Sequence, residues 1–443
     1  MVGILSILQR RFLKILCGKL KFFSYINPMF WLIEDKDKIQ EFCDKKYSDV
    51  FVEVIPSSTL LHPSQNTVSA LYIRPFDDVK GYIIPISHNE TLNLDISVLD
   101  DILDSIENIY VRNKKEFLHY FYRKNIFSPP PTPTTPTPQP LVYDYFSRLY
   151  PTNNSLNEII PIVKHYELCE EYFHSYDKDH MNDFYNNKVY LVYNMLERPG
   201  IKFNHELWNQ THDIKQGEYV FTNYNLNTTT VRPSNTFGGI NFPSLKKNND
   251  ERESFIPRND IFVEMDISGY HLYIIANLLN YNFNSADIHV DFAEMYNVDY
   301  QRAKEITFQQ IYGGVRKEYE HLEFFSKLKT YTNECWEKYT TDGYIECPIS
   351  KHIFKNTQDE EMNPPKLLNH IIQNMETSYN TLILWDVFKI LRGKNTKIVL
   401  TVFDSFLIDL DVEEKDCIFE IEKVFTKYGF KVKYKKGKTY NFK

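Results

Sequence analysis

A proline-rich tract divides the chain. Residues 129–140 read Pro-Pro-Pro-Thr-Pro-Thr-Thr-Pro-Thr-Pro-Gln-Pro, with seven prolines in twelve positions. Proline fixes φ and lacks a backbone N–H, so such a tract continues neither a helix nor a central strand and stays extended. We therefore expect a stiff linker between folded parts. The length of 443 residues leaves room for several domains around it.

The segment before the tract reads as a tail and a small α/β unit. Strand-like runs at residues 50–55, 67–73, 81–86 and 108–111 alternate with helical stretches at 98–106 and from residue 114, which places a domain at 46–128. Residues 1–45 form a separate segment, and its first 33 residues carry five basic and no acidic side chains, with apolar residues at helical spacing. We favour a helix packed on the body, while an interfacial helix and an organelle transit peptide remain alternatives.

Composition excludes several classes of protein. Hydrophobic residues make up 42% and charged residues 25% of the chain, as in globular proteins. The net charge of −8 argues against binding polyanions with the whole surface, but not against a local basic groove. Six scattered cysteines without a CxxC pair predict neither a zinc ribbon nor a disulfide framework, and no apolar run is long enough for a membrane span. We expect a cytoplasmic protein.

Two carboxylates carry the strongest chemical signal. Residues 261–267 alternate like a strand and contain Asp266 just before an apolar helix, for which Ser268 is the expected cap. Residues 397–402 and 406–410 predict a hairpin with Asp404 at its tip. Either aspartate alone is more often a turn or cap residue. Two of them on neighbouring strands would bind Mg²⁺ in the manner of two-metal phosphoryl transfer.

A helix predicted at residues 299–313 adds a second signal. Lys304, Phe308 and Tyr312 recur at every fourth position and therefore share one helix face. A cation followed by two aromatic rings suits a nucleoside triphosphate, although such a stripe is more often core packing.

Taken together and in this order, the segments from about residue 224 to 443 resemble family A DNA polymerases, the class of bacterial DNA polymerase I and many phage replicases. The first metal motif is matched at residues 265–272, the D-x-H element at 287–289, the fingers helix at 304–313 and the second metal motif at 402–405. Asn369 and Gln373 match a helix face that contacts primer and template. Residues 232–241 resemble a primer-contacting segment of phage-type members.

The resemblance implies a mixed α/β (α+β) right-hand polymerase fold. Its parts would be a helical thumb at 141–225, a palm at 226–289 and 351–443, and fingers at 290–350. The activity would be template-directed addition of dNTPs to a primer 3′-hydroxyl. Two Mg²⁺ (or Mn²⁺) ions would be held by Asp266, Asp404 and the carbonyl of Ile267, with Lys304 on the leaving phosphates. The nucleotide would contact His271, Phe308 and Tyr312, and primer–template DNA would contact Arg232, Asn241, Asn369 and Gln373.

Several positions depart from the family pattern. His271 stands where the family has Glu, and we expect it to bond Tyr312 and to preserve selectivity for dNTPs. Tyr300 replaces an Arg at the start of the fingers helix, with Arg302 about half a turn away. The family's residues on either side of the second metal Asp are replaced by Phe403 and Ser405. These changes leave fewer positive and polar side chains around the expected triphosphate site.

Residues 46–127 resemble, more weakly, the family's RNase H-like 3′→5′ exonuclease domain. That nuclease needs several carboxylates, and only Glu53 occupies such a position, while Ile55 and Phe117 replace others. We expect an inactive, supporting domain and no proofreading.

Two other functions stay in competition. One is a single-subunit RNA polymerase, and the other is a catalytically dead polymerase fold that acts as a DNA-binding scaffold. No GxxxxGK[ST] motif is present, so unwinding and priming would come from a helicase or primase, and processivity from a further partner. The residue usage and the phage-like segment favour viral or phage DNA replication.

Overall fold

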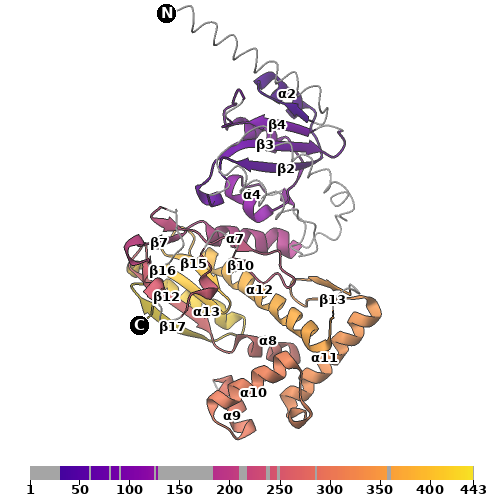
Figure 1. Ribbon diagram of the computed structural model, residues 1–443, viewed down its shortest axis with the longest axis vertical. Coiled ribbons are helices and arrows are strands. Elements are labelled where there is room, and N and C mark those ends of the chain that lie inside the picture. The colour runs from indigo at the N-terminus through magenta and orange to yellow at the C-terminus, as the bar shows by residue number, and fades with distance from the viewer. Residues whose placement is uncertain are drawn as a thin grey trace, which may run out of the picture. The chain divides into compact units, whose positions relative to one another are not determined.

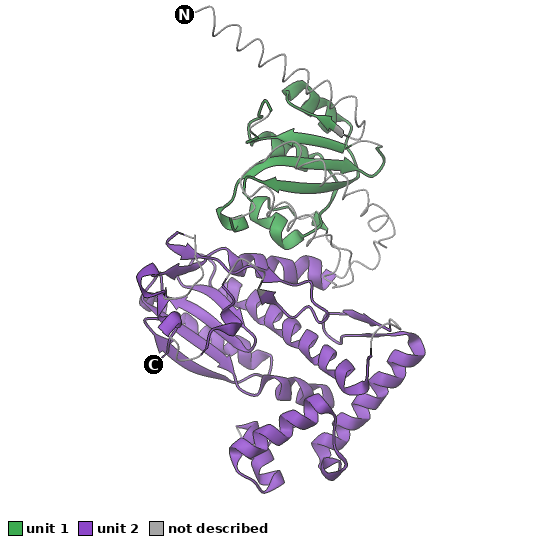
Figure 2. Ribbon diagram, viewed as in Figure 1, with its two compact units in different colours: residues 1–129, 136–178 green, residues 130–135, 179–443 purple. Residues whose placement is uncertain are grey.

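The computed structural model describes residues 30–58, 61–78, 81–88, 91–123, 126–127, 183–208, 217–235, 240–246, 250–284, 287–356 and 361–442. These residues form two compact units, one within residues 30–127 and one within residues 183–442 (Figure 2). The expected N-terminal helix, the proline-rich linker and most of the expected thumb lie outside the described residues. None of the helices within the described ranges is long and apolar enough to cross a membrane.

The first unit is built on a six-stranded sheet of order β1-β4-β3-β2-β5-β6 (Figure 1). Strands β2, β3 and β4 run antiparallel in succession, while β5 is parallel to β2 and β6 to β5. Counted from β2, the strand order is 3-2-1-4-5, which is the RNase H-like arrangement. The elements are β1 (Phe30–Leu32), α2 (Lys36–Asp44), β2 (Asp49–Pro56), β3 (Val68–Pro75), β4 (Gly81–Pro85), α3 (Val98–Asp104), β5 (Asn108–Tyr110), α4 (Lys114–Tyr120) and β6 (Ile126–Phe127).

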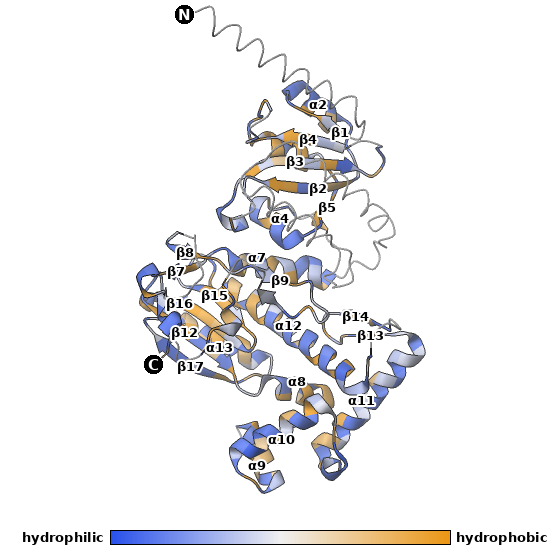
Figure 3. Ribbon diagram, in the orientation of Figure 1, coloured by the Kyte–Doolittle hydropathy of each residue, from blue (hydrophilic) through white to orange (hydrophobic). Residues whose placement is uncertain are grey.

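The second unit holds a four-stranded antiparallel sheet of order β15-β16-β12-β17. Its strands are β12 (Ile261–Ile267), β15 (Lys397–Val402), β16 (Ser405–Leu410) and β17 (Val432–Gly437). Strand β12 pairs on both sides and buries Phe262, Met265 and Ile267. The inner strands are predominantly hydrophobic, whereas the edge strand β17 is hydrophilic (Figure 3). Charged edge strands resist pairing with other chains.

Helices surround this sheet and extend away from it (Figure 1). The long helix α12 packs against α7, α8, α10, α11 and α13. The helices are α7 (Tyr190–Glu197), α8 (Tyr270–Leu279), α9 (Ile288–Tyr296), α10 (Tyr300–Gly313), α11 (Glu323–Asp342), α12 (Pro364–Ile390) and α13 (Cys417–Lys427). Short strands are β7 (Ile201–Phe203), β8 (Tyr219–Val220), β9 (Tyr224–Asn225), β10 (Ser234–Asn235), β11 (Phe255–Ile256), β13 (Tyr344–Glu346) and β14 (Ile353–Lys355). Single helical turns lie at Pro63–Gln65, Tyr185–Val189, His205–Leu207, Phe242–Ser244, Asp250–Ser254, Lys317–Tyr319 and Val412–Glu414.

Side-chain caps fix where the site helices begin. Asp287, Asp299 and Asn363 accept backbone hydrogen bonds at the starts of α9, α10 and α12. The expected cap of α8 is wrong: that helix begins after Gly269, at φ +64°, and no side chain caps it. A left-handed residue suits glycine because it carries no Cβ. The chain therefore turns sharply between Asp266 and α8.

Candidate active site

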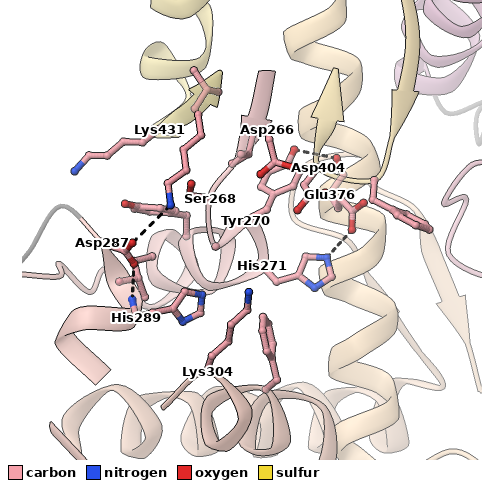
Figure 4. A pocket seen from close by; sticks show the side chains of 18 of the residues that line it. Asp266, Ser268, Tyr270, His271, Asp287, His289, Lys304, Glu376, Asp404 and Lys431 are labelled. Carbon is pink, nitrogen blue, oxygen red and sulfur yellow. Dashed lines mark hydrogen bonds and ion pairs between the residues drawn. The ribbon is translucent and has the colours of Figure 1, made fainter. Parts of the chain in front are cut away.

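The ends of neighbouring strands bring Asp266 and Asp404 together. Asp266 lies opposite Ser405 in the β12–β16 pairing, and the Ile267 N–H donates to the Asp404 carbonyl at 2.9 Å. Asp404 belongs to the tight turn between β15 and β16, as the sequence predicts. In this turn Phe403 adopts φ +56°, a strained value for a bulky residue. Both carboxylates line one cavity (Figure 4).

The cavity is large enough for a nucleotide, with a volume of about 610 Å³. Its walls come from β12, α8, α9, α10, α12, the β15–β16 turn and β17. Elements that are far apart in the sequence therefore meet here. Carboxylate and carbonyl oxygens are hard ligands, so Asp266, Asp404 and the carbonyl of Ile267 fit Mg²⁺ by their chemistry.

Helix α10 presents the predicted stripe to this cavity. Lys304, Phe308 and Tyr312 all line it. The rings of Phe308 and Tyr312 stack with centroids 5.9 Å apart and planes 7° apart, and the Lys304 Nζ lies 6.0 Å from the Phe308 ring centre. Tyr312 is 40% exposed, which excludes the core-packing interpretation for that residue. The stripe is thus available to a ligand.

Basic side chains line the cavity together with the Asp287 carboxylate, one oxygen of which lies 3.7 Å from Lys433 Nζ. His289 from α9 joins Lys304, and its Nδ1 is buried without a hydrogen-bond partner among the described residues. Burial and the nearby Lys304 lower the pKa of His289 and favour its neutral form. Lys431 and Lys433, at the start of β17, also line the cavity. Both belong to the lysine-rich last 21 residues, but the sequence did not indicate which lysines face the site.

Two positions that depart from the family pattern, Tyr300 and His271, make contacts in the cavity. Tyr300 donates a hydrogen bond from its hydroxyl to Asp287, 3.3 Å away, and lines the cavity. Arg302 points away and pairs with Glu305, so it does not substitute for the missing arginine. The expected hydrogen bond between His271 and Tyr312 is confirmed, with 2.7 Å between Nδ1 and the hydroxyl oxygen.

Sequence reasoning missed Glu376. This residue lies on α12, one turn beyond Gln373, with its side chain only 2% exposed. It contacts His271 (Figure 4) and pairs with Arg232. The sequence offers only a faint signal, a carboxylate on a largely apolar helix face.

The predicted DNA-contacting residues are only partly grouped. Arg232 lines the cavity and stacks 4.2 Å above the Phe403 ring. On α12, Asn369 donates to the Tyr312 carbonyl at 3.2 Å, and Gln373 accepts from the Thr230 hydroxyl at 3.1 Å. Asn241 is exposed and lies outside the cavity lining.

In the first unit, Glu53 pairs with the Arg112 guanidinium. A small hollow is lined by Glu53, Arg112 and Glu116. Glu116 is a second carboxylate at this place, and the resemblance did not assign it. The hollow measures about 20 Å³, roughly the space of one water. Ile55 and Phe117 are buried apolar residues, as expected at the replaced positions. A cation of the chain itself thus neutralises the one carboxylate that the resemblance assigned.

Comparisons with known proteins give a structural likeness alone. No protein-family model and no curated protein matches the sequence. Among solved structures, the chain is similar to the polymerase domain of Pol1 from M. smegmatis, solved in complex with DNA primer–template and dNTP. The identity is 13% and the TM-score 0.68, over 93% of this chain and 99% of that chain. The chain therefore has a right-hand DNA polymerase fold, of mixed α/β class.

Proposed function

We propose that the chain is a template-directed DNA polymerase of the family A type. The observation that carries this proposal is one cavity in which Asp266 and Asp404 face the Lys304, Phe308 and Tyr312 side of α10. In this proposal the palm comprises residues 226–289 and 351–443, the fingers 290–350 and the thumb 141–225.

The reaction is nucleotidyl transfer to a primer. The 3′-oxygen of the primer forms a bond to the α-phosphorus of a dNTP, and the bond from that phosphorus to the bridging oxygen breaks. Pyrophosphate leaves, and the proton of the 3′-hydroxyl passes to solvent water. Asp266, Asp404 and the Ile267 carbonyl would hold two Mg²⁺ or Mn²⁺ ions. Bound there, the ions supply activation of the hydroxyl and charge stabilisation.

Residues of α9, of α10 and at the start of β17 would bind the nucleotide. Lys304 and the neighbouring Lys431 and Lys433 offset the phosphate charge, which compensates for the arginine missing at position 300. The unpartnered Nδ1 of His289 gains a hydrogen-bond partner when a phosphate oxygen arrives. Phe308 and Tyr312 offer stacked rings to the base and sugar.

Primer and template would lie along α12 and the segment after β9. Asn369, Gln373, Arg232 and Asn241 are the proposed contacts. Excision is not expected, because Arg112 occupies the position beside Glu53 where a nuclease would need metal ions. We propose a role in viral or phage DNA replication, with helicase, primase and processivity functions supplied by partners.

Primer extension by the purified full chain tests the proposal. With Mg²⁺, primer–template and dNTPs, the wild type is expected to extend the primer, and Asp404→Asn to lose extension by about 10³-fold or more because a ligand charge is removed. Asp416→Asn is the matched control, since Asp416 is exposed and lies outside the cavity.

Further arms of the same assay separate the competing functions. Extension with rNTPs in preference to dNTPs identifies an RNA polymerase. DNA binding without extension by the wild type identifies a scaffold. A mismatched 3′ end incubated without nucleotides is expected to stay intact, and its shortening contradicts the inactive exonuclease-like domain.

A further inference from the structure

A buried carboxylate lies at the wall of the cavity and is used by neither the metal site nor the phosphate site. Glu376 accepts a hydrogen bond from Arg232 Nε at 3.1 Å, and the Arg232 Nη2 lies 3.1 Å from its other oxygen. That second oxygen is also 2.5 Å from His271 Nε2. A buried charge is costly unless it is paired and hydrogen-bonded, and Glu376 meets both conditions.

The contacts of Glu376 dictate where the protons lie. An ionised carboxylate only accepts hydrogen bonds, so His271 carries a hydrogen on Nε2. In the tautomer with that hydrogen, the other ring nitrogen, Nδ1, is an acceptor 2.7 Å from the Tyr312 hydroxyl, which is assigned as the donor. Burial, together with the Glu376 charge, raises the pKa of Tyr312 to about 12, so the hydroxyl keeps its proton at neutral pH. The order of donation is Tyr312 to His271 to Glu376.

This chain of hydrogen bonds joins four separate segments. Arg232 follows β9, His271 lies on α8, Tyr312 near the end of α10 and Glu376 in the middle of α12. The ring of Tyr312 is edge-on to His271, with centroids 5.9 Å apart, and is stacked on Phe308. Glu376 is thus linked through His271 to the Tyr312 ring, which stacks on Phe308 at the cavity.

We propose that Glu376 is a positioning residue that sets which sugar the enzyme accepts. Glu376 holds His271 in place, and His271 and Tyr312 together form a wall. The N–H and O–H donors of this wall are already used in hydrogen bonds to one another and to Glu376. A ribose 2′-hydroxyl pressed against this wall loses water without gaining a donor, and it meets two bulky rings. A deoxyribose has no 2′-hydroxyl and therefore loses no hydrogen bond to water at this wall. This inference rests on the proposed polymerase function and adds a determinant of its substrate class.

The test compares dATP with ATP opposite a template thymine. The measured quantity is the sugar ratio, which is kcat/KM for dATP divided by kcat/KM for ATP. Glu376→Gln is expected to lower this ratio about tenfold, because a hydrogen bond to a charged group is lost, while kcat for dATP changes far less. Glu197→Gln is the matched control, since Glu197 is equally buried but accepts from the Tyr224 N–H on another part of the unit.

A double-variant cycle shows whether Glu376 acts through His271. We expect His271→Ala to lower the sugar ratio, and His271→Ala/Glu376→Gln to lower it no further. An unchanged ratio in Glu376→Gln, or effects that multiply in the double variant, overturns the inference. If Glu376→Gln does not fold, Arg232→Gln/Glu376→Gln removes both charges of the pair. Because Arg232 is also a proposed DNA contact, only the sugar ratio of this double variant, and not its kcat, is compared, and the ratio is again expected to fall.

Binding separates this inference from the proposed function. A wild type that extends no primer refutes the polymerase proposal, yet its complex with a dideoxy-terminated primer–template can still be titrated with dATP and with ATP. Tighter binding of dATP that Glu376→Gln weakens supports the sugar wall. Equal binding of the two nucleotides by the wild type overturns it.

Discussion

At the residue scale, single lysines from separate elements line the part of the cavity that we propose binds phosphate. Lys304 reaches it from α10, whereas Arg302, two residues earlier, is exposed and paired with Glu305. The two side chains carry the same charge on the same helix, so only their direction distinguishes them. A charge that contacts the phosphates in the transition state is worth several kcal/mol, while an exposed ion pair is worth little.

Lys304→Ala is therefore expected to lower kcat/KM for dNTPs by about 10²-fold or more. Arg302→Ala should change it by less than about threefold. Steady-state primer extension measures both variants. Similar losses in the two would mean that α10 acts through its overall charge and not through a contact of Lys304.

Individual residues also show which parts of the candidate site could be predicted from the sequence and which could not. The cavity aspartates Asp266 and Asp404 and the α10 stripe were predictable because each lies within a short, local motif. Glu376 was not, since its role arises from the packing of α8 against α12, more than a hundred residues apart in the chain. Glu264 is a similar case: it is buried beside Ser405, whose hydroxyl donates to it at 3.0 Å, and it pairs with Lys435. Such contacts depend on tertiary structure and leave no local pattern.

At the scale of elements, the β13–β14 hairpin is held to α12 by buried polar groups. Ser350 donates to Asn374 at 2.6 Å, and Asn374 donates in turn to the Thr230 carbonyl at 3.0 Å. Beside them His352 is buried against the rings of Tyr185 and Phe354. Burial lowers the pKa of His352 from 6.5 to about 4.

This depressed pKa predicts acid sensitivity. Between about pH 6.5 and pH 4 the unfolded chain takes up a proton on this histidine and the folded chain does not, so stability falls as the pH falls. The loss on going from pH 7 to pH 4 is about 3 kcal/mol for this group. His352→Gln should remove that part of the loss, and urea unfolding of wild type and variant at both pH values measures it.

His321→Gln is the control for the histidine prediction, because His321 is exposed. It should keep the pH dependence of the wild type. If the free energy of unfolding falls equally from pH 7 to pH 4 in His352→Gln and in the wild type, this imidazole is not kept neutral by burial.

The elements themselves were largely predictable. The hairpin carrying Asp404, the helix at residues 299–313 and the helix near residues 365–392 occur as expected, since strong periodicity specifies them. The start of α8 was not predicted correctly, because Gly269, in a left-handed conformation, precedes the helix where the sequence suggested Ser268 as the cap. Local turn geometry decides such a boundary, and the pattern of apolar residues does not record it.

At the scale of the whole molecule, an acidic chain with net charge −8 must bind anionic ligands through a concentrated set of cations. The lysines near the C-terminus illustrate how these cations are divided. Lys431 and Lys433 face the cavity, while Lys435 neutralises the buried Glu264. The first two could serve either the nucleotide or the DNA backbone, and salt dependence separates the two roles.

We expect Lys431→Ala/Lys433→Ala to raise KM for dNTPs about tenfold, since charge-assisted contacts to phosphate are lost. The slope of log affinity for primer–template against log salt should stay unchanged, because released counterions report contacts to DNA phosphates. Lys415→Ala/Lys436→Ala is the matched control: it removes the same charge from exposed positions outside the cavity. A slope reduced by about two, with KM for dNTPs unaltered, would instead assign both lysines to the DNA backbone.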